Sequence, residues 1–118
     1  MILKNTIFLI ALAFSVSAAA GTPVGNAAAG KDKASKVCSA CHGADGNHTL
    51  DASYPRLAGQ YPEYLSKALH DYKSGKRSNP IMAGQAQGLS DQDIADLSAY
   101  FGSVNGQGQI HDLSGHAR

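Results

Sequence analysis

The sequence predicts an all-α domain of about three main helices joined by long loops. Three segments, near residues 27–40, 61–75 and 90–102, combine apolar residues at helical spacing with signals for helix ends. Between them, residues 43–60 lack apolar periodicity and residues 76–88 are polar, so both stretches are expected to be loops.

The first 20 residues are typical of a cleaved export signal. Lys4 supplies a positive charge, residues 7–16 form a short apolar run, and Ala18 and Ala20 fit the rule for small residues at the cleavage site. The run is shorter than the roughly 20 residues that a membrane span needs. We therefore expect residues 1–20 to be removed on export to the periplasm, leaving no membrane span.

The rest of the chain is expected to form one small domain with a thin core. The full sequence has 118 residues with no Trp and only three Phe. A core of this size is only marginally stable unless covalent links or a bound cofactor stabilise it. Its 10 basic and 9 acidic residues balance once Lys4 is lost. No basic stripe with interleaved aromatic residues is present, and a nucleic-acid partner is therefore not expected.

Residues 21–29 are rich in small residues and predict a flexible leader, in which Asn26 is a candidate helix cap. The first helix is expected from about Ala27 to Ala40. Gly30 and Ala34 lie on its apolar face, where small residues would allow another helix to cross closely. The folded domain is expected to span residues 30–102.

Residues 38–42 read Cys-Ser-Ala-Cys-His, the attachment signature of a c-type haem. Two cysteines three residues apart share a helix face, so both thiols can reach the two vinyl groups on one edge of a porphyrin. His42 follows directly and can bind the iron as its proximal ligand. Cys38, Cys41 and His42 are therefore expected to hold one covalent haem c.

Three other interpretations of this motif stay open. A redox dithiol of the thioredoxin type is expected within a βαβ pattern, which the sequence does not show. A structural zinc site needs four ligands, whereas the chain has two Cys. A simple disulfide suits an exported protein but gives His42 no role.

The loop at residues 43–60 is long enough to suggest that it wraps a bound group, for which the haem is the obvious candidate. The second helix is expected to begin at Tyr61-Pro62, since Pro suits the first helical position, and to end at Gly75. Its apolar stripe consists of Leu65, Ala68, Leu69 and Tyr72.

The third helix has the strongest start signal in the sequence. Ser90 is the expected cap, Asp93 completes a variant of the capping box, and Leu89 precedes the cap as a hydrophobic staple. The expected core face carries Ile94, Leu97 and Phe101, with Tyr100 beside it. Residues 103–118 are rich in Gly and polar residues and predict a flexible tail.

Met82 is the candidate for the second iron ligand. The sequence has two Met, and the other is the initiator, which is lost with the signal. A thioether is the sulfur ligand of electron-transfer cytochromes, and a loop after Pro80 can return to the far side of a haem. The alternatives are that Met82 fills a gap in the core, or that His48, His70, His111 or His116 binds the iron.

From about Gly25 to Phe101 the chain resembles small bacterial class I cytochromes c of the c553/c4 group. The matching segments are Cys-Ser-Ala-Cys-His-Gly at 38–43, Tyr-Pro-Arg-Leu-Ala-Gly-Gln at 54–60, Pro-Ile-Met at 80–82, Leu-Ser-Asp at 89–91 and Ala-Tyr-Phe at 99–101. The resemblance implies the class I cytochrome c fold around one haem, with the first and last helices crossing at right angles. It also implies that the Pro55 carbonyl accepts a hydrogen bond from His42, and that Arg56 and Gln60 lie near the haem propionates.

These observations favour an electron carrier with His42 and Met82 on the iron, and not an enzyme, because no catalytic acid and base pair stands near a recognisable substrate pocket. The carrier would exchange electrons with redox partner proteins, docking near Lys73, Lys76 and Arg77, the densest basic cluster. Two alternatives stay open. The chain would otherwise be the haem subunit of a periplasmic oxidoreductase complex, or a peroxidase-like haem protein with an open sixth site.

Overall fold

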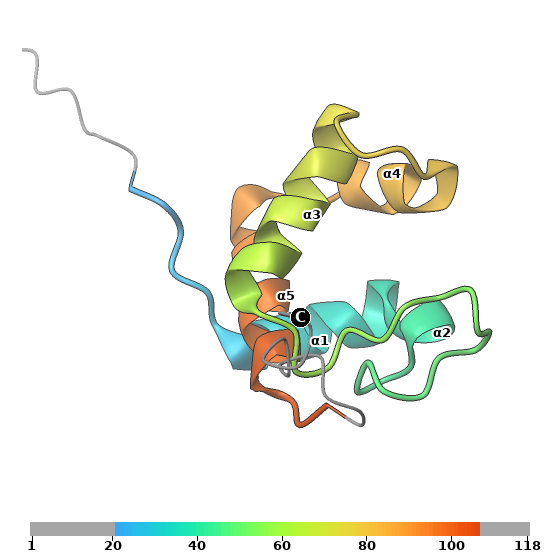
Figure 1. Cartoon of the computed structure of the whole chain (residues 1–118). Coiled ribbons are helices and arrows are strands. Elements are labelled where there is room, and N and C mark those ends of the chain that lie inside the picture. Colours follow the sequence, from blue (N-terminus) through green and yellow to red (C-terminus); the bar gives the residue numbers. More distant parts are fainter. Residues whose placement is uncertain (1–20, 107–118) are drawn as a thin grey trace, which may run out of the picture.

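The structure is a computed structural model that describes residues 21–106. The expected signal peptide and residues 107–118 of the expected tail, with His111 and His116, lie outside the described part. The described residues form five helices and no strand, in the order α1 (Ala27–Val37), α2 (Ser39–His42), α3 (Pro62–Ser74), α4 (Pro80–Gln87) and α5 (Asp91–Ser103) (Figure 1). The prediction of an all-α fold is confirmed. None of these helices is long and apolar enough to cross a membrane.

The first helix begins where it was expected and ends earlier. Asn26 caps α1, its side-chain oxygen accepting the N–H groups of Ala28 and Ala29 at 3.0 and 3.1 Å, so residues 27–29 are a helical turn and not part of a leader. The expectation of one continuous helix to Ala40 is wrong. The chain turns at Cys38, whose carbonyl accepts from both Cys41 N–H at 3.2 Å and His42 N–H at 3.0 Å, and α2 follows as a separate short turn.

The two other predicted helices are confirmed. Pro62 opens α3, and Gly75 ends it in the left-handed conformation with φ of 81°. At the start of α5, the Ser90 hydroxyl accepts the N–H of Asp93 while the Asp93 carboxylate accepts the N–H of Ser90, which completes the capping box. The Ser90 N–H and the ammonium of Lys33 together lower the pKa of Asp93.

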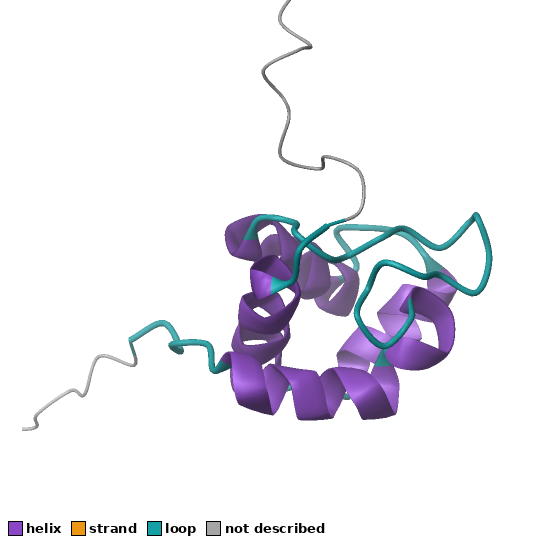
Figure 2. Cartoon of the chain, turned by 90° about the horizontal axis from the view of Figure 1, so that it is seen from below, coloured by secondary structure: helices purple, strands orange, loops and turns teal. Residues whose placement is uncertain are grey.

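Residues 76–88 were expected to be a loop, and this expectation is wrong because they contain α4. The helix starts at an Asn79-Pro80 pair, with Asn79 as the cap and Pro80 in the first helical position. It has no apolar stripe, and Ala86 is its buried residue. Helical periodicity therefore could not reveal it. By contrast, residues 43–61 form the expected long loop, drawn in teal on one side of the helices in Figure 2.

α1 runs across α5 in close contact (Figure 1). A Cβ atom built on Gly30 would overlap the carbonyl oxygen of Asp96 and would lie 2.8 Å from the Cβ of Tyr100. Ala34, one turn further along α1, is 1% exposed. The expected close crossing at these two small residues is thus present, and it brings the end of α1 to a defined place beside α5.

One apolar cluster joins these helices. It is built mainly by α5, with one residue from α1, one from α3 and Leu89 from the connection before α5. Its buried members are Ala34, Leu65, Leu89, Ile94, Leu97, Tyr100 and Phe101. Because α3 packs against both α5 and α4, the cluster indirectly supports α4 as well.

We predict that Gly30→Ala lowers the free energy of unfolding by about 1 to 3 kcal/mol, because the new methyl group forces α1 away from α5. Gly84→Ala is the matched control, since no atom lies within 4 Å of a Cβ built there. That variant should gain up to about 1 kcal/mol from helix propensity. Chemical denaturation of both variants measures the difference, and a Gly30→Ala protein as stable as the wild type would contradict the crossing.

Candidate haem site

A cavity of about 460 Å³ lies between α2, α3, α4 and α5. Its volume is within the range of small-molecule sites, and most of its walls are apolar or aromatic. The lining residues are Val37, Cys38, Ala40, Cys41, His42, Ser53, Tyr54, Pro55, Arg56, Leu57, Gln60, Tyr64, Leu65, Ala68, Leu69, Tyr72, Arg77, Asn79, Ile81, Met82, Gln85, Leu89, Leu97, Ser98 and Phe101. All seven residues expected at the haem are among them.

His42 is held in one orientation by the loop that follows it. Its imidazole is buried, and Nδ1 lies 2.8 Å from the carbonyl oxygen of Pro55, the partner that the resemblance implies. A carbonyl oxygen only accepts, so Nδ1 must carry the hydrogen. The lone pair of the imidazole is therefore on Nε2, which is the arrangement that a metal ligand needs.

The loop is in turn anchored to α5. The Tyr100 hydroxyl donates to the carbonyl of Ala44 at 3.0 Å, and the N–H of Gly59 donates to the carbonyl of Phe101 at 2.8 Å. The buried side chain of Asn47 donates to the carbonyl of Asn105 at 3.0 Å. Sequence reasoning missed Asn47 and Tyr100 in this role, because both bonds join residues more than fifty positions apart.

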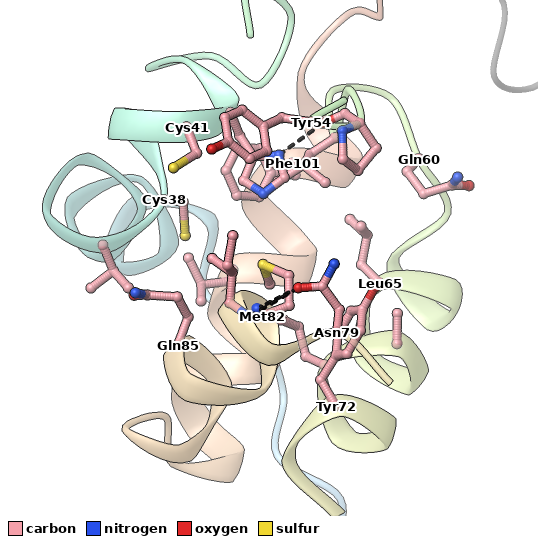
Figure 3. A pocket seen from close by; sticks show the side chains of 18 of the residues that line it. Cys38, Cys41, Tyr54, Gln60, Leu65, Tyr72, Asn79, Met82, Gln85 and Phe101 are labelled. Atoms are coloured by element: carbon pink, nitrogen blue, oxygen red, sulfur yellow. Dashed lines mark hydrogen bonds between the residues drawn. The ribbon is translucent and has the colours of Figure 1, made fainter. Parts of the chain in front are cut away.

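Cys38 and Cys41 are not joined by a disulfide and lie on one wall of the cavity (Figure 3). The turn at Cys38 sets the start of α2 and keeps both side chains on the side of the cavity from which His42 also comes. Burial raises the pKa of the Cys38 thiol to about 11, so this thiol is neutral at physiological pH.

Met82 lies on the other side of the cavity. His42 is close to Tyr54, with ring centroids 6.3 Å apart, and Figure 3 shows Met82 across the cavity from Tyr54 and Phe101, its sulfur directed into the space between. Met82 reaches this place as the third residue of α4, where its N–H donates to the side chain of Asn79 at 3.0 Å. Asn79 was also missed, although an Asn-Pro pair is itself a helix start signal.

The rival ligands and rival sites find little support in the described residues. His48 and His70 are exposed and do not line the cavity, and they lie 3.4 Å from Asp45 and 3.9 Å from Asp91 respectively. Within residues 21–106, no three His, Cys, Asp or Glu side chains come together as a metal site. Nor does this part of the chain contain the strands of a thioredoxin-type unit.

The donor set fits a covalently attached haem. Two thiols on one wall suit thioether bonds to the porphyrin edge, the free Nε2 of His42 suits the iron, and the thioether of Met82 on the other wall would suit a second position on it. The apolar side chains of Leu65, Leu97 and Phe101 suit the faces of the macrocycle. Arg56 and Gln60 also line the cavity, and the Gln60 side-chain oxygen accepts the N–H of Tyr61 at 2.9 Å.

Comparison with known proteins agrees with this arrangement. The family model described as Cytochrome c matches residues 27–105. Cytochrome c4 of Pseudomonas aeruginosa is 56% identical over 79 residues, which are 67% of this chain and 38% of the relative. Cytochrome c-554(548) of Halomonas halodenitrificans is 48% identical over 82 residues, which are 67% of this chain and 96% of the relative.

Two further similarities concern a solved structure and a protein complex. The crystal structure of cytochrome c4 from Pseudomonas stutzeri matches with a TM-score of 0.66 and 43% identity, covering 71% of this chain and 48% of that one. The cytochrome subunit of sulfide dehydrogenase of Chlorobaculum tepidum is 37% identical over 68 residues, 58% of this chain and 60% of the relative.

The chain spans about two fifths of the length of the cytochrome c4 relatives, which are 38% and 42% covered in the Pseudomonas aeruginosa and Thiocapsa roseopersicina proteins. The match nevertheless includes the whole cavity, from Val37 to Phe101. The chain therefore belongs to the cytochrome c family and is a bacterial class I c-type cytochrome, whose family binds haem c covalently.

Proposed function

We propose that this chain is a periplasmic one-electron carrier with a single haem c, and not an enzyme. When bound, the haem supplies one-electron exchange between ferric and ferrous iron. Cys38 and Cys41 hold it, and His42 and Met82 ligate the iron. The observation that supports the proposal is that His42, beside Tyr54, and Met82 lie on opposite sides of one cavity. If His42 and Met82 both bind the iron, no site on the metal is left open to a substrate.

The remaining roles of the chain's residues follow from this. Pro55 keeps the Nε2 lone pair of His42 available by accepting from Nδ1. Arg56 lines the cavity with a permanent positive charge and is proposed to meet the haem propionates, with Gln60 nearby. Export is proposed to depend on residues 1–20, removed as a signal peptide.

One prediction from the proposed function concerns the number of haems. The mature protein should carry one haem per chain, with both cysteines consumed as thioethers, because only one Cys-x-x-Cys-His motif is present. Mass spectrometry of the intact protein, followed by thiol titration under denaturing conditions, measures both quantities. Two free thiols, or an internal disulfide without added haem mass, would contradict the proposal.

Another prediction from the proposed function concerns Met82. The oxidised protein should show a weak far-red sulfur-to-iron charge-transfer band, and Met82→Ala should abolish it and admit cyanide or carbon monoxide. The reduction potential should fall by a substantial part of the roughly 0.8 V range that axial ligands span, because a thioether favours ferrous iron.

Ile81→Ala is the control for this experiment, since Ile81 also lines the cavity from α4 and is 55% exposed. It should leave the band in place. A wild-type protein that already binds carbon monoxide rapidly, or a band that survives in Met82→Ala, would favour the open-site enzyme instead.

The redox partner is proposed to be a protein with an acidic surface that docks near the end of α3. In the basic cluster expected there, Lys73 donates from its ammonium to the carbonyl of Leu89. Arg77 donates to the Tyr64 hydroxyl at 3.2 Å and lies over the ring of Tyr72, 4.9 Å from its centroid. The Tyr64 hydrogen bond raises the pKa of Arg77. Lys73 and Arg77 thus have structural roles, and the exposed Lys76 is the residue to test.

We predict that Lys76→Glu lowers the rate of association with the partner several-fold at low ionic strength, and that the difference disappears as salt is added. Lys31→Glu makes the same change of charge at an exposed position on α1 and should have a smaller effect. Stopped-flow electron transfer at several salt concentrations gives both rates. Equal effects of the two variants would show that only the net charge of the protein matters and would contradict docking near Lys76.

A second candidate function is that of the haem subunit of an oxidoreductase complex. The similarity to the cytochrome subunit of sulfide dehydrogenase favours it. The two functions differ in the state of the native protein, since a carrier purifies alone and a subunit purifies with its dehydrogenase. Size-exclusion chromatography of material isolated at low salt distinguishes them.

A further inference from the structure

The position of Met82 is set by the first turn of α4. The Met82 N–H donates to Oδ1 of Asn79, and the same oxygen accepts the N–H of Ile81, both at 3.0 Å (Figure 3). The backbone carbonyl of Asn79 accepts the N–H of Ala83 at 2.8 Å. Since Pro80 has no N–H, Asn79 alone satisfies every backbone donor of this turn.

Little else holds this turn in its helical conformation. α4 has eight residues, its first turn contains no acidic side chain, and Ala86 near its far end is its buried residue. Helices of this length are not stable on their own, because nucleation costs more than a few hydrogen bonds return. The cap therefore contributes a large share of what keeps Met82 in place.

The orientation of the Asn79 amide follows from its partners. Two backbone N–H groups point at one end of the amide, and that end must be the oxygen, because the nitrogen only donates. Asn79 also lines the cavity beside Met82. The side chain that closes the helix turn is thus at the site itself.

We infer that Asn79 is a positioning residue for Met82, and that its cap controls how readily the Met82 thioether leaves the iron. The inference rests on the proposed function, in which Met82 is a ligand. When Met82 leaves, the first turn of α4 unwinds and the cap is lost. An added ligand binds only to the form from which Met82 has left, so its apparent affinity reports the population of that form.

The test is a titration of the oxidised holoprotein with imidazole, followed through the loss of the sulfur-to-iron band. Asn79→Ala should raise the apparent affinity about fivefold, the effect expected from an N-cap of ordinary strength. Asn79→Ser should restore the wild-type affinity, because a serine hydroxyl caps as well as asparagine does.

Asn26→Ala is the matched control. Asn26 caps α1 with the same geometry, accepting two N–H groups at 3.0 and 3.1 Å, and does not line the cavity. Its loss should lower stability to a similar extent and leave the imidazole affinity unchanged. An equal rise in both variants would mean that general destabilisation frees the ligand, and would overturn the inference, as would an unchanged affinity in Asn79→Ala.

If the Asn79→Ala protein does not accumulate, variants with a weaker capping residue at this position still test the inference. The apparent affinity for imidazole should then be lowest with Asn or Ser at residue 79 and higher with Thr or Gly, because it rises as the capping strength falls. The absence of this order would overturn the role of Asn79. For Met82→Ala, which lacks this band, imidazole binding is followed through the change in the main haem absorption. A wild-type affinity equal to that of Met82→Ala would instead contradict ligation by Met82, so that failure of the proposed function is recognised separately.

Discussion

The close crossing of α1 and α5 at Gly30 determines where the parts of the site lie. It fixes the end of α1, from which the turn at Cys38 leads to Cys41 and His42. The other helix of the pair, α5, holds the following loop through the hydroxyl of Tyr100 and the carbonyl of Phe101. That loop supplies the carbonyl of Pro55 to His42. One backbone contact, possible only without a side chain at residue 30, thus places both the imidazole and its hydrogen-bond partner.

The sequence was informative where a local signal for a helix end accompanied an apolar stripe. The ends of α3 and α5 follow from Pro62, Gly75 and the capping box at Ser90, each of which acts within four residues. Seven of the cavity residues were expected there, from one contiguous motif, from the one Met that remains after the signal and from the resemblance. Two features were not revealed by the sequence. The helix α4 has a cap but no apolar stripe, and the break at Cys38 arises where the carbonyl of Cys38 accepts the N–H groups of Cys41 and His42.

Long-range side-chain contacts could not be predicted from the sequence either. Lys73 and Arg77 were expected to be free for a partner, yet their donors meet a carbonyl and a hydroxyl at separations of sixteen and thirteen residues. No residue pattern marks such pairs before the fold is known. They also give the basic cluster a structural role. Together with Gln87, which donates to the carbonyl of Lys73 at 2.7 Å, they connect α3 to the last residue of α4 and to the chain on either side of that helix.

The core and the cavity share their apolar residues, and this links folding to the cofactor. Leu65, Leu89, Leu97 and Phe101 belong to the buried cluster and also line the cavity. In a domain this small, with no Trp, these side chains must supply most of the apolar burial, yet one side of each faces the space where the haem is proposed to lie. Filling that space with a large apolar group supplies the packing contacts that these buried side chains lack on that side, and two thioether bonds make the gain permanent. The haem then acts as the missing part of the core, which explains how so thin a core suffices.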